Sequence, residues 1–298
     1  MSLRFSLFVL LMMLVSFAQA QLELSVTQSS GLKAVVINQK FPALKILLPD
    51  QSALDRGIEI EFPEHVTAVD AVTRQVKQFY LITREDATNR TVPKWRREGK
   101  TTLVYETEFD HNISMTAKAT LEPDGLRYVY EFKNRSKQSY INFQAVTCVQ
   151  LYSVFSDTLL QRTYVHHSDG FDLLASESPE RLTKPEEEWL PCRYLVSYNW
   201  SVNAKRIEKD MDGITRYNKS RKADKPFIAA YSHDKSWIAA TYTKETGNLW
   251  SNPERSCQHV DPAVNLKAGE TKQLELKTFV MKGTLDQLLV LIDKEQRK

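Results

Sequence analysis

Apolar and polar residues alternate along most of the chain, a pattern typical of β-strands with one buried face. A Pro-Asp-Gly turn at residues 123–125 joins two of these runs and predicts a hairpin. Strands this frequent, with few helical windows, predict an all-β fold built as a large antiparallel two-sheet sandwich. The runs cover residues 22–26, 32–37, 57–62, 76–82, 102–109, 113–121, 126–132, 140–151, 194–198, 227–231, 237–242 and 273–281.

Two segments break the alternation. Residues 155–161 predict a short helical turn entered through Ser156 or Asp157. Near the C-terminus, Thr284 and Gln287 have the spacing of a capping box, which predicts that a helix begins there. An apolar stripe at helical spacing follows, formed by Leu285, Leu288, Leu289 and Ile292. We expect a short C-terminal helix packed on a sheet.

The N-terminus has the three parts of a secretory signal. Arg4 precedes an apolar run over residues 5–17, and Ala18-Gln19-Ala20 is a small-x-small cleavage site. The apolar run is shorter than the ~20 residues that a spanning helix needs. We therefore expect residues 1–20 to be a cleaved signal peptide and residues 21–298 to form a single β-sandwich domain. The mature protein would be secreted or periplasmic.

Charge and motifs narrow the range of partners. The formal net charge is +3, with Lys and Arg scattered among Asp and Glu, so neither a nucleic acid nor a membrane partner is expected after signal cleavage. The densest basic stretch, residues 94–97, is interpreted as a solvated loop. Hydrolase, phosphate-loop and dinucleotide motifs are absent from the sequence, and with nine glycines no cofactor is expected.

Three cysteines follow the signal: Cys148, Cys192 and Cys257. In an oxidising compartment one disulfide with one free thiol is possible, and three buried thiols are an equal alternative. Cys192 and Cys257 lie beside Pro-containing irregular segments, so they are the first choice for a bridge. Cys148 lies within an apolar strand, which predicts a buried thiol.

The run from Asp124 through Asn134-Arg135-Ser136 to Phe143 resembles a recurring segment of the galactose-mutarotase-like fold. There a strand ends at an Asn-x-Ser/Thr turn and the next strand crosses the other sheet. The ending is similar too, with a Gly269-Glu270 turn, a long strand and Gly283. The resemblance spans residues 22–291 and implies a large two-sheet antiparallel β-supersandwich, found in sugar epimerases, polysaccharide lyases and accessory domains of glycosidases.

This resemblance implies a carbohydrate ligand, but not mutarotation. Sugar mutarotases use a His acid and a Glu base on opposing strands. Glu254 and Glu270 lie in turn-like contexts, so neither matches that base.

The richest polar segment covers residues 248–262. Its mixture suits a sugar site: Trp250 could stack on a ring, Asn252 and Arg255 could bind hydroxyl or carboxylate groups, and His259 could transfer a proton. The alternative is a purely structural role, in which Trp250 fills the core and the polar residues cap turns.

A second segment, residues 162–170, contributes Arg162 and His166 as candidates. His166 and His167 would point to opposite faces of a strand, so at most one faces a given cleft. We expect Trp250, Arg255 and His259 to converge with Arg162 and His166 in one concave patch. Catalysis would then fall to His259 and His166, and substrate binding to Trp250, Arg255, Arg162 and Asn252.

A metal-site hypothesis would combine Cys257, His259 and Asp261 with His166 or His167. The usual ligand spacings are missing, so no metal is expected. The resulting prediction is an exported carbohydrate-binding or carbohydrate-active protein, with acidic glycans among the carbohydrate partners considered. The alternative is a non-catalytic structural or protein-interaction module of the cell envelope.

Overall fold

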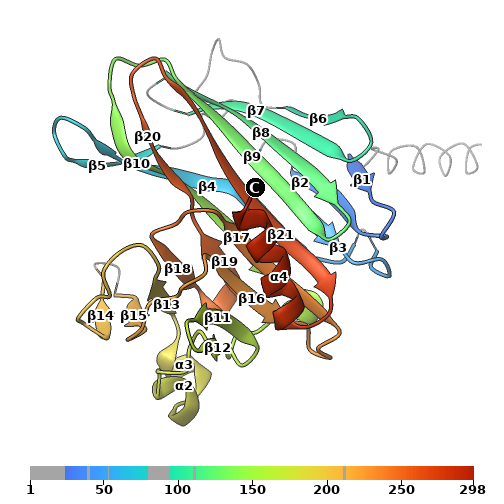
Figure 1. The fold of residues 1–298 in the computed structure, drawn as a ribbon, viewed down its shortest axis with the longest axis vertical. Coiled ribbons are helices and arrows are strands. Elements are labelled where there is room, and N and C mark those ends of the chain that lie inside the picture. Colours follow the sequence, from blue (N-terminus) through green and yellow to red (C-terminus); the bar gives the residue numbers. More distant parts are fainter. Residues whose placement is uncertain (1–23, 39–40, 53, 80–93, 110–111, 211–212) are drawn as a thin grey trace, which may run out of the picture.

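The protein is described by a computed structural model that covers residues 24–38, 41–52, 54–79, 94–109, 112–210 and 213–298. The predicted signal peptide, residues 1–20, lies outside the described residues. Strands dominate the fold and form two sheets (Figure 1). Nearly all neighbouring strands run antiparallel, which confirms the predicted all-β two-sheet sandwich; β13 and β15 pair in parallel.

The first sheet has twelve strands and carries the site described below. Two of these strands lie off its main path: β5 pairs with β4, and β20 pairs with β10. In spatial order the path is β1 (Ser25–Thr27), β2 (Lys33–Asn38), β3 (Ala43–Leu47), β4 (Ile58–Asp70), β10 (Tyr140–Leu151), β19 (Cys257–Val260), β18 (Asn248–Ser251), β13 (Cys192–Ser197), β15 (Thr215–Asn218) and β14 (Ile207–Lys209), with β5 at Val76–Phe79 and β20 at Ala263–Leu266.

The second sheet has nine strands. Its spatial order is β12 (Gly170–Leu173), β11 (Thr163–His167), β16 (Phe227–Tyr231), β17 (Trp237–Thr243), β21 (Thr271–Lys282), β9 (Gly125–Asn134), β8 (Ile113–Glu122), β7 (Thr102–Phe109) and β6 (Lys94–Glu98).

Among the described residues, helices are few and short. The longest, α4 (Leu285–Gln296), covers the outer face of β16, β17 and β21 (Figure 1). The others are α2 (Glu180–Thr183), α3 (Glu186–Trp189) and the 3-10 turns η2 (Ser153–Phe155) and η3 (Pro253–Arg255). No helix among the described residues is long and apolar enough to cross a membrane.

The C-terminal helix begins as predicted. The Thr284 hydroxyl accepts from the Gln287 backbone N–H, and the Gln287 side chain accepts from the Thr284 backbone N–H, which completes the capping box. Leu285, Leu288 and Ile292 are buried against the sheet, so the helix is held by its apolar stripe.

The interior between the sheets is filled by the inward half of each alternating strand. One cluster joins β2–β4 and β10 to β7–β9 and β21, and it is rich in aromatic rings in tilted and edge-on contact, such as Tyr130, Phe132 and Phe143. A second cluster joins β13, β18 and β19 to β11 and β16. The opposite residues of each strand therefore face outward, which decides where a site can lie.

The predicted hairpin is present, with Glu122 paired to Gly125 between β8 and β9. Gly125 has a φ of +147°, and a Cβ there would meet the Thr278 carbonyl oxygen at 2.1 Å. Glycine is therefore required at this turn by both conformation and space.

Several predictions differ from the structure. The basic stretch at residues 94–97 is strand β6 rather than a loop, and Arg96 pairs with Glu98 and Glu106 across the sheet surface. The segment 248–262, interpreted as irregular, holds the short strands β18 and β19 around η3. These strands are too short for alternation to be visible in the sequence.

Candidate functional site

A hollow of about 460 Å³ opens on the outer face of the twelve-stranded sheet. Its lining comes mainly from five strands, β4, β10, β18, β13 and β15, and includes Asp261 just after β19. Its lining consists of Glu64, His65, Thr67, Gln144, Val146, Arg193, Leu195, Trp200, Arg216, Asn248, Trp250, Asn252 and Asp261.

Strand alternation explains why these side chains face outward. In β18, Leu249 is fully buried between the sheets, whereas Asn248 and Trp250 point into the hollow. In β13, Tyr194 packs inward and Arg193 lines the hollow. Because successive side chains point to opposite faces of a strand, the same strands supply both the inner core and the outer site.

Trp250 forms the floor of the hollow. Its indole stacks on the His259 ring, with the ring centroids 3.5 Å apart and the planes at 10°. Its Nε1 donates to Asp261 Oδ2 at 3.0 Å, while Asp261 Oδ1 accepts from the Thr147 backbone N–H at 2.8 Å. The Arg193 guanidinium lies 5.4 Å from the Trp250 ring centroid. The floor is therefore held rigidly in place.

A second indole stands at the rim. Trp200 lines the hollow and remains half exposed. A Cβ built on Gly247 would meet Trp200 Cε2 at 2.6 Å, so the indole lies directly against that backbone. Two tryptophans thus contribute flat apolar surface to one polar hollow.

Five polar side chains of the lining are unengaged. Glu64, His65, Arg193, Asn248 and Asn252 make no side-chain hydrogen bond or ion pair within the described part of the chain, and Asn252 Oδ1 is a buried acceptor without a partner. Buried polar groups normally have partners. Groups left free where a cavity opens are suited to a ligand.

Charges around the hollow are mixed. Arg216 is already paired with Asp210, at 3.1 Å. Burial, with the Glu64 charge beside it, raises the pKa of the neighbouring Glu61 carboxyl, while Arg255 and His259 oppose that rise. Burial lowers the pKa of His65, so its imidazole stays neutral near pH 7.

The two predicted catalytic histidines do not meet in this hollow. His259 is 1% exposed and lies beneath Trp250, so it does not contact the hollow. Burial disfavours its charged form, but Asp261 and Cys148 outweigh that effect and raise the pKa of His259 to about 9.

His166 lies on the other side of the molecule. In β11, Val165 joins the core between the sheets and Tyr164 joins the cluster beneath α4, so His166 faces the same way as Tyr164, away from the twelve-stranded sheet. Its Nδ1 lies 2.6 Å from Asp224 Oδ1.

The Arg162 guanidinium is engaged in contacts within the protein. It donates to the Tyr231 and Ser156 carbonyl oxygens and pairs with Asp157 at 3.5 Å. The predicted single patch is therefore wrong, because the two segments lie on opposite outer faces. Of the predicted binding residues, Trp250 and Asn252 line the hollow, while Arg255 lies exposed on η3 outside the lining.

Of the two alternatives left open for the cysteines, the structure has three free, buried thiols, and the Cys192–Cys257 bridge is wrong. Cys192 points between the sheets from β13, whereas Cys257 lies on the outward side of β19 next to Cys148 and His259. The two predicted partners thus occupy opposite faces of one sheet. The buried thiol predicted at Cys148 is confirmed.

Comparison with known proteins bears on the fold. No protein-family model matches the chain, and no curated protein matches it in sequence. Among solved structures, the Slr1438 protein from Synechocystis is similar with a TM-score of 0.51 at 7% identity, covering 88% of this chain and 96% of that one.

Two further similar structures are a putative aldose 1-epimerase from Escherichia coli and an aldose epimerase homologue from C. elegans. Each has a TM-score of 0.49 at 9% identity. The alignments cover 87% and 88% of this chain, respectively, and 99% of each matched chain. A galactose mutarotase related enzyme from Lactobacillus acidophilus and a galactose mutarotase-like protein from Lactobacillus casei are also among the matches, with TM-scores of 0.47 and 0.44. At these identities the likeness concerns the fold alone.

The residues missed from the sequence are His65, Arg193, Asn248 and Trp200. Trp200 was visible as one of five tryptophans. The others are single polar residues in strands, and only the pairing of distant strands brings them together.

Proposed function

We propose that this protein is an exported carbohydrate-binding protein whose ligand occupies the hollow over Trp250. The supporting observation is the meeting of two indoles with five unengaged polar side chains in a cavity of about 460 Å³. Sugar rings present apolar C–H faces and hydroxyl edges, so a site that holds them combines aromatic surface with hydrogen-bonding groups.

The charge of the site favours an acidic glycan. The Arg193 guanidinium has no ion-pair partner among the described residues and faces the hollow. A guanidinium matches a carboxylate through two parallel hydrogen bonds. A uronic acid or another carboxylate-bearing sugar would supply the carboxylate that pairs with Arg193.

Export rests on the N-terminal sequence, with Arg4, the apolar residues 5–17 and the Ala18-Gln19-Ala20 site. The full chain expressed with its own leader should be recovered outside the cytoplasm with Gln21 as its first residue. N-terminal sequencing of the fractionated protein checks this. Recovery in the cytoplasm with residues 1–20 intact would refute export.

A glycan array combined with product assays tests the proposed function. The mature chain should bind one class of glycans, with carboxylate-bearing members ahead of their neutral counterparts. Product formation would make the protein an enzyme, and binding without product would make it a binding module. No binding to any glycan would favour the envelope interaction module instead.

Removing the rim indole should weaken this binding. Trp200→Ala is expected to cost about 1–2 kcal/mol of binding free energy, roughly a tenfold rise in Kd, because an aromatic contact with the sugar is lost. Gly247→Ala should weaken binding too, since its Cβ would displace the Trp200 ring. Titration calorimetry with the strongest glycan measures both.

The control for Trp200→Ala and Gly247→Ala is Val290→Ala, which shortens an exposed apolar side chain on α4. It should leave both affinity and melting temperature unchanged. Wild-type affinity in Trp200→Ala would show that the indole plays no part in the site.

A further inference from the structure

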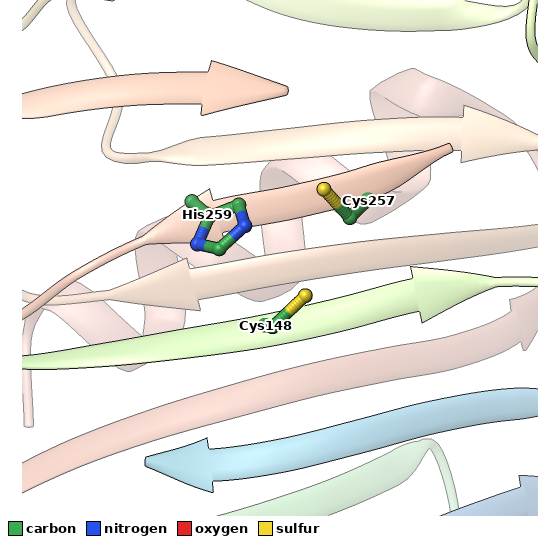
Figure 2. A group of neighbouring side chains, drawn as sticks. All are labelled: Cys148, Cys257 and His259. Carbon is green, nitrogen blue, oxygen red and sulfur yellow. The ribbon is translucent and has the colours of Figure 1, made fainter. Parts of the chain in front are cut away.

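Three potential metal ligands meet beneath the hollow. Cys148 from β10 and Cys257 and His259 from β19 present two sulfurs and one ring nitrogen that all lie within 4.8 Å of one another (Figure 2). The three residues are 4%, 0% and 1% exposed.

The strand register explains this meeting. In β19, Cys257 and His259 are two residues apart and share a face. β10 runs antiparallel beside it, with Val149 opposite Gln258 and Gln150 opposite Cys257. Cys148, the next residue along that ladder, therefore joins the same face. The cluster is fixed by two paired strands and does not depend on a loop.

His259 supplies an independent sign that something is bound. Neither of its ring nitrogens has a hydrogen-bond partner among the described residues, although the residue is almost fully buried. The nearest charged atom, Asp261 Oδ1, is 3.8 Å from Nδ1, which is too far for a hydrogen bond. A buried imidazole without partners is costly, and a bound ion would remove that cost.

We propose that Cys148, Cys257 and His259 bind a thiophilic closed-shell metal ion, Zn²⁺ or Cu⁺. Two thiolates and an imidazole are the ligands that these ions prefer, and harder ions such as Mg²⁺ and Ca²⁺ take oxygen instead. Both cysteine thiols release their protons on binding, and so does the imidazolium of His259. Ligand atoms on one tetrahedral Zn²⁺ stand about 3.5–3.8 Å apart, so the side chains have to close around it by up to about 1 Å.

Two neighbours support this assignment. The Asp261 carboxylate lies 3.8 Å from His259 Nδ1, close enough to attract the imidazole electrostatically, and it is itself held by Trp250 and Thr147. Trp250 stacks on the same imidazole from above. The ion would therefore fix the ring that supports the floor of the hollow, a structural role rather than a catalytic one.

Metal uptake by the reduced full chain tests this proposal. The protein is unfolded and refolded in reducing buffer with Zn²⁺ or, without oxygen, with Cu⁺, and bound metal is measured after gel filtration by elemental analysis. A single equivalent of either ion, together with a higher melting temperature, is expected. Refolding with Co²⁺ should give thiolate-to-metal absorption, which identifies sulfur ligands without any mutation.

The third cysteine provides a matched control. Cys257→Ser and Cys148→Ser should each lose the bound ion and the stabilisation, whereas Cys192→Ser, which changes an equally buried thiol in the other core cluster, should keep both. Failure of reduced wild-type protein to take up either ion would overturn the proposal. So would unchanged uptake by Cys257→Ser, or a Cys148–Cys257 disulfide found by mass spectrometry in the protein as isolated.

Discussion

Lys277→Met is expected to destabilise the fold by about 3 kcal/mol, since it removes the cation from a buried charge cluster while keeping the apolar stem. The Lys277 side chain is 3% exposed on the outer face of β21. Its Nζ lies 2.7 Å from Glu122, 2.8 Å from Asp124 and 3.6 Å from Glu295 on α4. Without Lys277, Glu122 would keep its ion pair with Arg127, and Glu295 would keep its ion pairs with Arg127 and Lys298.

Chemical denaturation at pH 7 measures this loss. Lys118→Met is the matched control, because Lys118 is half exposed and pairs with Glu98 on the surface, where an ion pair contributes less than about 1 kcal/mol. Equal effects of the two substitutions would show that the cluster contributes no more than a surface pair.

The difference between wild type and Lys277→Met should shrink in acid. Burial tends to raise the pKa of both Glu122 and Glu295, but their cationic partners outweigh it and lower each pKa below the ordinary 4.5. A carboxyl with a lowered pKa stabilises the fold fully above pH 4.5 and loses that contribution as the pH falls through its folded pKa. A gap that stays constant from pH 7 to acid would contradict this origin.

Charge reversal at Arg193 should abolish most glycan binding. Arg193→Glu removes the unpaired guanidinium of the hollow and places a carboxylate near Glu64. A lost hydrogen bond to a charged group costs about 3 kcal/mol, roughly 100-fold in Kd, and repulsion of an acidic sugar adds to it. Calorimetric titration with the strongest acidic glycan and its neutral counterpart measures the effect.

Comparing the affinities for the acidic and the neutral glycan separates the effect of charge from that of packing. The acidic glycan should lose far more affinity than the neutral one, and Arg135→Glu, the same change at an exposed position just after β9, should affect neither. Equal losses for both glycans would mean that Arg193 shapes the hollow without recognising charge.

The fold could be predicted from the sequence wherever one strand face is buried and the strand is long. The expected run 102–109 is β7, 140–151 is β10 and 227–231 is β16, and the capping box at Thr284 marks the start of α4. Signals of this kind are local, so neighbouring residues suffice to detect them. Short strands such as β18 and β19 leave too few residues for a period to be seen.

The site depended on strand pairing, which the sequence does not reveal. His65, Arg193 and Trp250 come from three strands far apart in the chain, and Cys148 meets His259 only because β10 pairs with β19. Alternation placed His166 and His167 on opposite faces, but it could not say which face held the hollow. That choice is made by the packing of the two sheets.

The central claim is that a carbohydrate binds over Trp250, and a crystal structure with the strongest glycan from the array tests it most directly. The account predicts a sugar ring against Trp200 and Trp250, with its carboxylate on Arg193 and its hydroxyl groups on Asn248 or Asn252. A glycan bound on the nine-stranded sheet, or on any surface away from these residues, would contradict it.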